Sequence, residues 1–130
     1  MQVSNPYLQY QQNAVLTAGQ EKLTLMLYQG ALRFTRQAAA YMLENNTQET
    51  HNVLVRTQDI MLYLISTLNS GVEVADSLGR LYDFIYAQLV EANFKKDPAI
   101  LEGAERLLQE LAETWVEAMQ KNSGKAGDSQ

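Results

Sequence analysis

The residues able to do acid–base or nucleophilic chemistry are few and scattered along this sequence. His51 is the single imidazole, and no cysteine is present to act as a thiolate, a disulfide partner or a metal ligand. A di-iron helical bundle needs two Glu-x-x-His motifs, whereas the residue three positions before His51 is Gln48. The glycines are scattered and form no phosphate-binding loop. We therefore expect no catalytic residue, no metal site and no cofactor.

Carboxylates and arginines are the other residue types that could support chemistry on helices. Glu110, Glu113 and Glu117 recur at helical spacing, but no histidine or aspartate is interleaved with them. This pattern favours a solvated helix face over a metal site. Inward arginines can clamp a dicarboxylate, as in chorismate-mutase-like enzymes, and Arg33 and Arg36 flank an apolar stripe. No second basic residue lies at a neighbouring turn to complete a clamp, so we expect a protein that is not an enzyme.

The elements that must position these residues are four amphipathic helices. Apolar residues recur at a spacing of three to four over residues 20–45, 47–69, 74–96 and 98–120. Pro6 precedes these segments and Pro98 stands at the first position of the last one, so neither proline interrupts a long helix. Long helices with mostly short connections predict an all-α fold, an antiparallel four-helix bundle with an extended N-terminal arm.

Local signals mark the helix ends. Asp97 before Pro98 predicts the sharpest start, because Asp caps a helix and Pro suits its first position. Thr47 is the expected cap of the second helix, and Thr17 or Gly19 of the first. Gly30, inside the first helix, suggests a close approach between two helices, since glycine costs about 1 kcal/mol there relative to alanine.

The chain divides into three segments. Residues 1–16 are polar but carry apolar handles, and we interpret them as an arm that covers a binding groove. Residues 17–120 form the bundle, and residues 121–130, rich in Gly and Ser, are expected to be a disordered tail. The handles of the arm are Tyr7, Tyr10, Val15 and Leu16.

Charge and hydropathy exclude several partners. The formal net charge is -5, and no cationic track suited to nucleic acid or to an anionic membrane surface is visible. No apolar run approaches the roughly 20 residues that span a bilayer, and the first residues do not resemble a signal peptide. We therefore expect a soluble protein of the cytoplasm that binds no nucleic acid and does not insert into membranes.

Apolar residues on the second and third helices exceed what one inward stripe can hold. Such a surplus can reflect a broader core, a homodimer interface, scattered exposed residues, or a groove that accepts an amphipathic helix of another chain. Tyrosines favour the groove, because their rings tolerate both water and burial. The residues in excess are Leu62, Tyr63, Phe84, Tyr86, Val90 and Phe94.

Several segments carry a family resemblance in the same chain order. Residues 5–18 read Asn-Pro-Tyr-Leu-Gln-Tyr-Gln-Gln-Asn-Ala-Val-Leu-Thr-Ala, and residues 23–34 read Leu-Thr-Leu-Met-Leu-Tyr-Gln-Gly-Ala-Leu-Arg-Phe. Further along stand Arg-Thr-Gln-Asp-Ile at 56–60, Leu-Gly-Arg-Leu-Tyr-Asp-Phe at 78–84 and Leu-Val-Glu-Ala-Asn at 89–93. Asp97 and the pair Thr114-Trp115 extend the pattern. Over about residues 5 to 120 the chain resembles the flagellar export chaperone FliS family.

Two positions depart from that family's pattern. Gly19-Gln20 stands where Ser-Pro commonly follows Thr-Ala, which leaves the cap of the first helix open. Thr57 stands where Ala is usual, a small polar exchange within the second helix. Neither change touches the function that the resemblance implies.

The resemblance implies a bacterial cytoplasmic chaperone that holds the disordered C-terminal segment of flagellin. Binding would prevent premature polymerisation and deliver flagellin to the flagellar type III export apparatus, with export-gate components and a regulator or co-chaperone as further partners. We expect a monomer or weak dimer; the alternative is a self-associating structural bundle with no client. The expected flagellin-binding groove comprises Ile60, Leu64, Leu68, Tyr82, Ile85, Tyr86, Leu89 and Asn93, whereas Trp115 is expected in the core.

Overall fold

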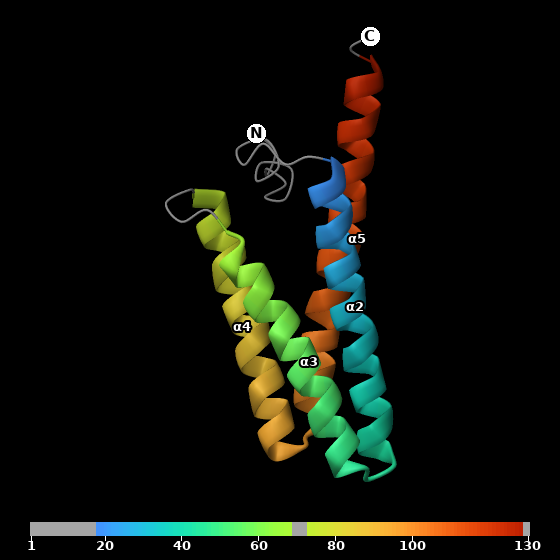
Figure 1. The fold of residues 1–130 in the computed structure, drawn as a ribbon, viewed down its shortest axis with the longest axis vertical. Helices are drawn as coiled ribbons and strands as arrows, with labels where there is room; N and C mark the ends of the chain where they lie inside the picture. The colour runs from blue at the N-terminus through green and yellow to red at the C-terminus, as the bar shows by residue number, and fades with distance from the viewer. Residues whose placement is uncertain (1–17, 69–72, 129–130) are drawn as a thin grey trace.

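The protein folds as four α-helices, which confirms the predicted all-α bundle (Figure 1). The computed structural model describes residues 18–68 and 73–128, with side-chain surroundings for 19–68 and 73–121. The helices are α2 (Ala18–Leu43), α3 (Thr47–Ser66), α4 (Glu73–Lys95) and α5 (Pro98–Asp128). The predicted arm, with Tyr7, Tyr10, Val15 and Leu16, lies outside the described residues.

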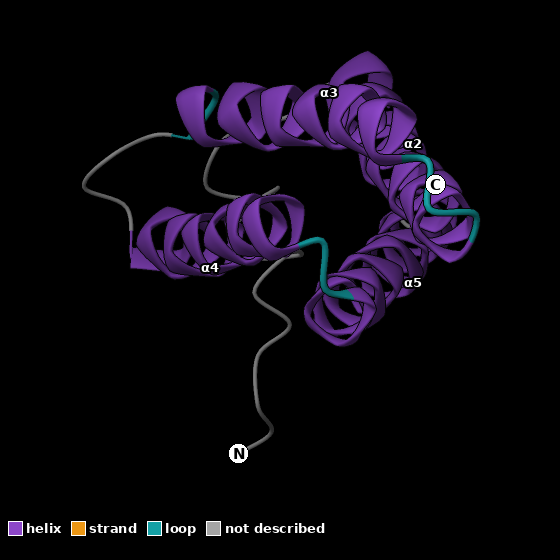
Figure 2. Cartoon of the chain, turned by 90° about the horizontal axis from the view of Figure 1, so that it is seen from below, coloured by secondary structure: helices purple, strands orange, loops and turns teal. Residues whose placement is uncertain are grey.

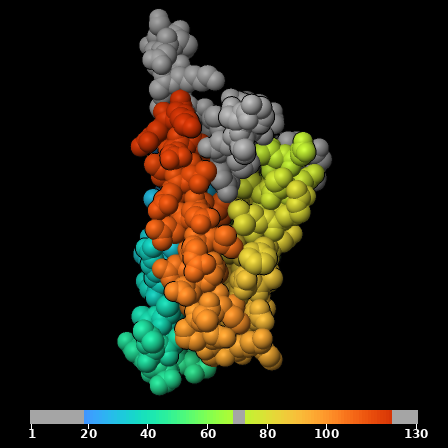
Figure 3. All heavy atoms as spheres, turned by 180° about the vertical axis from the view of Figure 1, so that it is seen from behind, coloured from blue at the N-terminus to red at the C-terminus, as the bar shows by residue number. Residues whose placement is uncertain are grey.

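Each helix packs against its two neighbours in a closed ring. Among the described residues, the helices whose backbones approach closely are α2 with α3, α3 with α4, α4 with α5 and α5 with α2, whereas the backbones of diagonal helices stay apart. Seen from behind, α5 lies between α2 and α4 (Figure 3). The pair α3–α4 leans away from the pair α2–α5 towards the end where α2 begins (Figures 1 and 2). We call this the open end of the bundle.

Large apolar side chains from all four helices fill the centre of the ring. The periodic residues of each helix point inward, as the spacing predicts, and burying them supplies most of the stability of a bundle. The largest fully buried side chains include Trp115, Tyr28, Leu54, Met61, Ile85, Leu89, Leu101, Leu108 and Leu111. The expectation that Trp115 lies in the core is therefore confirmed.

The connection between α2 and α3 is built by two asparagines. Asn45 takes a left-handed backbone (φ 57°), and the Asn46 N–H donates to the Tyr41 carbonyl at 2.9 Å, which closes α2 in a Schellman-type end. The Asn46 side chain then accepts from the Glu49 N–H at 3.2 Å. Asn46, rather than the expected Thr47, therefore caps α3, because its side chain reaches the free N–H groups of the first turn.

The expected cap of α2 and the expected end of α3 are also corrected. Gly19 lies inside α2, which begins at Ala18, so it does not cap that helix. The helix α3 ends at Ser66, three residues before Asn69, where the Ser66 and Thr67 hydroxyls donate to the Tyr63 and Leu64 carbonyls. These hydroxyls compete with backbone N–H groups for the same acceptors and favour a helix end.

The last helix extends further than expected. We predicted an end at Gln120 and a disordered tail over 121–130, whereas α5 continues to Asp128. No proline interrupts residues 121–128, and each glycine there costs only about 1 kcal/mol. The predicted start of α5 is confirmed: Asp97 Oδ1 accepts from the Ala99 N–H at 2.9 Å, and Pro98 takes the first helical position.

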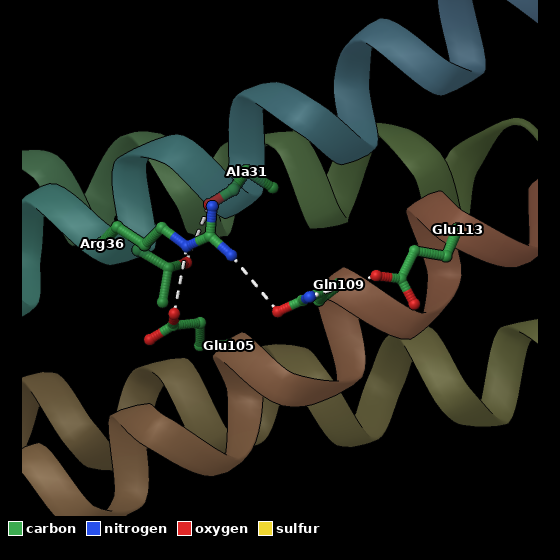
Figure 4. A network of polar contacts seen from close by, with 6 residues as sticks. Ala31, Arg36, Glu105, Gln109 and Glu113 are labelled. Atoms are coloured by element: carbon green, nitrogen blue, oxygen red, sulfur yellow. Dashed lines mark hydrogen bonds and ion pairs between the residues drawn. The ribbon is translucent and has the colours of Figure 1, made fainter. Parts of the chain in front are cut away.

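A polar network on the surface ties α2 to α5. The Arg36 guanidinium donates through Nε to Glu105 at 3.0 Å and through a terminal nitrogen to Gln109 at 3.2 Å (Figure 4). Gln109 in turn donates to Glu113 at 3.1 Å. This network lies outside the core and holds one side of the ring together.

Candidate protein-binding surface

The residues that could bind a metal ion are dispersed in the described part of the chain. No group of three or more His, Cys, Asp or Glu residues is positioned to hold a metal ion within 18–68 and 73–128. The ring of His51 instead links two helices: its Nδ1 accepts from the Asn93 amide at 3.0 Å. The Lys96 ammonium donates to Asn93 Oδ1 at 2.8 Å, which orients that amide. The predicted groove residue Asn93 is therefore committed to joining α3 and α4.

A pocket opens at the open end of the bundle, where all four helices contribute to its wall. Its volume is about 190 Å³, comparable to one large apolar side chain. Its rim includes the polar groups of Gln20, Thr24 and Thr67, and most of its other lining side chains are apolar or aromatic. We call it the end pocket; it is lined by Gln20, Leu23, Thr24, Leu27, Tyr63, Leu64, Thr67, Leu68, Tyr82 and Trp115.

Three aromatic residues support the end pocket from inside the core. The Tyr28 ring packs edge-on to Trp115 with centroids 5.7 Å apart, and the Tyr28 and Tyr82 hydroxyls are 2.5 Å apart. The Trp115 Nε1–H donates to the Glu21 carbonyl at 3.0 Å in the first turn of α2. Tyr82 and Trp115 therefore belong both to the pocket wall and to the buried core.

The seam between α2 and α3 continues from the end pocket along the outside of the bundle. A Cβ placed on Gly30 would lie 3.8 Å from Ile60 Cδ1, which is ordinary contact and marks the level where the helices meet. The helices meet at Gly30, as its position suggests, but an added methyl group has room, so the contact does not require glycine. Towards the open end this seam exposes Leu23 and Met26 on α2 and Tyr63 on α3.

The seam between α3 and α4 is the second apolar strip on the surface. At its open end α3 comes so close to α4 that a Cβ on Gly79 would lie 3.3 Å from Leu68 Cδ1. Further along, Leu62 and Val90 are exposed, and Tyr86 is half-buried. On α3 and α4 together, the apolar surplus predicted from the sequence is confirmed. The exposed fractions of the side chains are 46% for Leu62, 49% for Tyr63, 52% for Phe84, 40% for Val90 and 87% for Phe94.

The structure separates the eight predicted groove residues into three groups. Leu64, Leu68 and Tyr82 come together at the end pocket. Ile60 lies half-buried in the α2–α3 seam, and Tyr86 lies half-buried against the core. Ile85 and Leu89 are fully buried at 0% exposure, and Asn93 is held by His51 and Lys96. Those last three present almost no surface to a partner in this conformation.

Sequence reasoning missed the contribution of α2 to this surface. Leu23, Thr24 and Leu27 line the end pocket, and Met26 is exposed beside it. These residues fitted the inward stripe of the helix equally well, so spacing alone did not set them apart. The departure of α3–α4 from α2–α5 at the open end leaves this part of the stripe uncovered.

Within the described part of the chain no helix combines the length and the apolar character needed to cross a bilayer.

Comparison with known proteins identifies related chains over almost the whole length. A family model described as flagellar protein FliS matches residues 3–122. A flagellar secretion chaperone FliS from Bacillus subtilis is 42% identical over 121 residues, covering 92% of this chain and 90% of the relative. The Escherichia coli flagellar secretion chaperone FliS is 29% identical over 111 residues, covering 83% of this chain and 82% of the relative.

A solved structure shares the fold. A crystal structure of a flagellar chaperone from bacteria superimposes on this protein with a TM-score of 0.74 and 22% sequence identity. The match covers 88% of this chain and 95% of that chain.

Proposed function

The chain belongs to the FliS family of flagellar secretion chaperones, and from this premise we propose that its client is the disordered C-terminal segment of flagellin. The family relation makes it a chaperone with a flagellar client and not an enzyme. Holding the client segment would prevent flagellin subunits from polymerising before export. The observation that carries this proposal is the end pocket together with the exposed apolar residues on both flanks of α3.

The surface suits a chain that wraps around α3. One flank of this helix exposes Tyr63 beside Leu23 and Met26, and the other exposes Leu62 near Tyr86 and Val90. An amphipathic helix laid along either seam would place its apolar face on these residues. An extended client that folds on contact can use both seams and insert one apolar side chain into the end pocket.

The energetics favour a large contact of this kind. Ordering a disordered segment costs about 2–5 kcal/mol of the gross interaction energy. Burial of apolar area contributes about 25 cal/mol per Å², so a few hundred Å² on the two seams offset that cost. A small contact at the end pocket alone would not.

The N-terminal arm is the proposed cover of this surface when the client is absent. The arm precedes Ala18 in the sequence, and Gln20, near the start of α2, lines the end pocket. Tyr7, Tyr10, Val15 and Leu16 are the handles that would dock. A docked arm lowers the apparent client affinity in proportion to the fraction of covered molecules.

The remaining partners follow from a role in export. The loaded chaperone would act in the bacterial cytosol and present flagellin to the flagellar type III export apparatus. A regulator or co-chaperone would bind a part of the surface that the client leaves open. The competing proposal is a self-associating bundle in which a second copy covers the apolar seams. Sedimentation of the free protein separates the two, because a tight dimer without flagellin affinity supports self-association and a monomer argues against it.

Calorimetric titration with the C-terminal segment of a flagellin tests the proposed function. We expect one-to-one binding, a negative heat-capacity change and a gain in helicity measured by circular dichroism. The emission of Trp115, the single tryptophan, should shift as the end pocket fills. The absence of binding at high micromolar concentration, with or without residues 1–16, would contradict the proposal.

A pair of matched variants locates the contact. Tyr63→Glu puts a charge on a half-exposed residue of the end pocket and should weaken binding about tenfold or more, because the charge must be desolvated. Leu43→Glu makes the same kind of change at an 81% exposed position at the opposite end of α2 and should leave binding unchanged. Equal effects of both variants would place the client elsewhere.

A further inference from the structure

Two arginines from different helices lie at the same level of the α2–α3 seam. Gly30 and Ile60 mark a point where the helices touch. Arg33 lies three residues beyond Gly30, about 4.5 Å along α2, and Arg56 lies four residues before Ile60, about 6 Å along α3. Because consecutive helices of the bundle run antiparallel, both displacements point away from the open end. Both spacings keep the residue on the same face of its helix as the contact.

The Arg33 guanidinium is already held over the seam. Its carbon atom Cζ lies 5.9 Å from the centroid of the Phe34 ring, and a terminal nitrogen lies 3.8 Å from the position of a Gly30 Cβ. Across the seam, Arg56 lines a shallow surface depression together with Gln37 and Tyr41 of α2. Helices in contact are about 8–10 Å apart, so one carboxylate between them is within reach of both side chains.

Neither arginine is neutralised by the described part of the chain. The ion pairs formed by residues 18–68 and 73–128 are Arg36 with Glu105 and Lys95 with Glu91. Asp59 lies three residues after Arg56, and Glu49 lines the same depression, but neither forms an ion pair with an arginine. The seam therefore has an apolar stretch near the open end and a cationic pair further along.

We propose that the α2–α3 seam binds an amphipathic client helix in a fixed register, with a client carboxylate held between Arg33 and Arg56. The inference rests on the proposed function and deepens it, because it names the chemistry of the client helix and its position. An apolar side chain of the client fills the end pocket, and the apolar face of the helix covers Met26 and Tyr63. Arginine side chains offer planar pairs of N–H donors that suit a carboxylate, and covering them with the client helix strengthens the contact.

The geometry sets the spacing of these two client groups. Leu23, at the end pocket, lies ten residues before Arg33, which is about 15 Å along α2. A client helix that runs along the seam covers this distance in about ten to eleven residues, or three turns. The apolar anchor and the carboxylate then lie on one face of the client helix.

Titration with two synthetic amphipathic helical peptides tests the proposal on the full-length protein. Both carry a leucine anchor, and about eleven residues away one carries Glu and the other Gln. We expect the Glu peptide to bind about tenfold more tightly, equivalent to about 1.4 kcal/mol. This preference should shrink as salt is added, because the charges are partly screened. Since the change is made in the peptide, the folding of the protein is not affected.

Variants of the protein complete the test. In R33Q/R56Q the two peptides should bind equally, while the Gln peptide keeps its wild-type affinity. R106Q removes a charge from an exposed position on α5 and should keep the tenfold preference. Moving the Glu by two residues along the peptide should also abolish the preference, because it turns the carboxylate away from the arginines.

The outcomes separate this inference from the proposed function. Equal binding of both peptides by the wild type, with flagellin segment binding intact, would overturn the carboxylate register and leave the chaperone proposal standing. A preference for Glu that survives R33Q/R56Q would also overturn it. If the wild type binds neither the flagellin segment nor the peptides, both proposals fail.

Discussion

Three buried threonines point into the bundle, and the hydroxyl of each donates to the backbone carbonyl four residues earlier in the chain. Thr35 donates to the Ala31 carbonyl at 2.8 Å, Thr50 to the Asn46 carbonyl at 2.8 Å and Thr57 to the Val53 carbonyl at 3.0 Å. A buried hydroxyl without a partner would be costly, whereas these bonds let threonine occupy a core position. The unusual Thr57 therefore fits the core without an unsatisfied polar group.

The helical glycines differ in how much space an added methyl group would have. A Cβ on Gly103 has nothing within 4 Å, whereas a Cβ on Gly79 would press on Leu68 Cδ1 at 3.3 Å. We expect Gly103→Ala to raise the free energy of unfolding by about 1 kcal/mol through helix propensity. Gly79→Ala should give no net gain, because Leu68 must move at the α3–α4 contact. Chemical denaturation of both variants measures this, and an equal gain would show that the contact at Gly79 is loose.

At the scale of elements, the connections decide where each helix starts and stops. The connection from α2 to α3 is short, because Asn45 takes the left-handed backbone that ends α2 and the Asn46 side chain caps α3. The link from α4 to α5 repeats this arrangement with Lys96 (φ 50°) and the cap Asp97. Tight connections at this end bring all four helices together, which leaves the apolar seams to open at the other end.

The cap of α3 provides a direct test of the structure against the sequence pattern. Asn46→Ala removes the side-chain bond to the Glu49 N–H and should lower the free energy of unfolding by about 1 kcal/mol. Thr47→Ala, at the position expected from the sequence, should change it by less than about 0.5 kcal/mol. Thermal or urea denaturation compares the two. A larger loss for Thr47→Ala would mean that the helix starts one residue later.

At the scale of the whole molecule, the ring of four helices leaves one end incompletely closed. The α3–α4 pair leans away from the α2–α5 pair at this end (Figure 1), and residues of all four helices line the end pocket there. Tyr82 and Trp115 serve both the core and the pocket, since both are almost fully buried and both line the end pocket. A client that fills the pocket would complete the core of the bundle, so binding should also raise the melting temperature.

Deletion of residues 1–16 tests the proposed cover. We expect the shortened protein to bind the flagellin segment more tightly or equally well, because a competing segment has been removed. Calorimetry under the conditions used for the full chain measures the change. A large loss of affinity would instead make the arm part of the binding site. Circular dichroism of the shortened protein serves as the control that the bundle is still folded.

The sequence by itself determined the helices, their order and the family. Periodic apolar residues, the start signal at Asp97 and Pro98, and the segment resemblances all depend on neighbours along the chain, so they can be read without tertiary structure. The apolar surplus at residues such as Tyr63 and Phe94 was visible for the same reason, since a helix has room for only one inward stripe.

Only the tertiary structure decided which apolar and charged residues form the surface. Ile85 and Tyr82 share one stripe of α4, yet Ile85 is sealed in the core and Tyr82 lines the end pocket. Arg33 and Arg56 are far apart in the sequence, and the contact between Gly30 and Ile60 brings them to a similar level of the α2–α3 seam. Such outcomes depend on the lean and register of neighbouring helices, which arise from packing between residues far apart in the chain and leave no local pattern in the sequence.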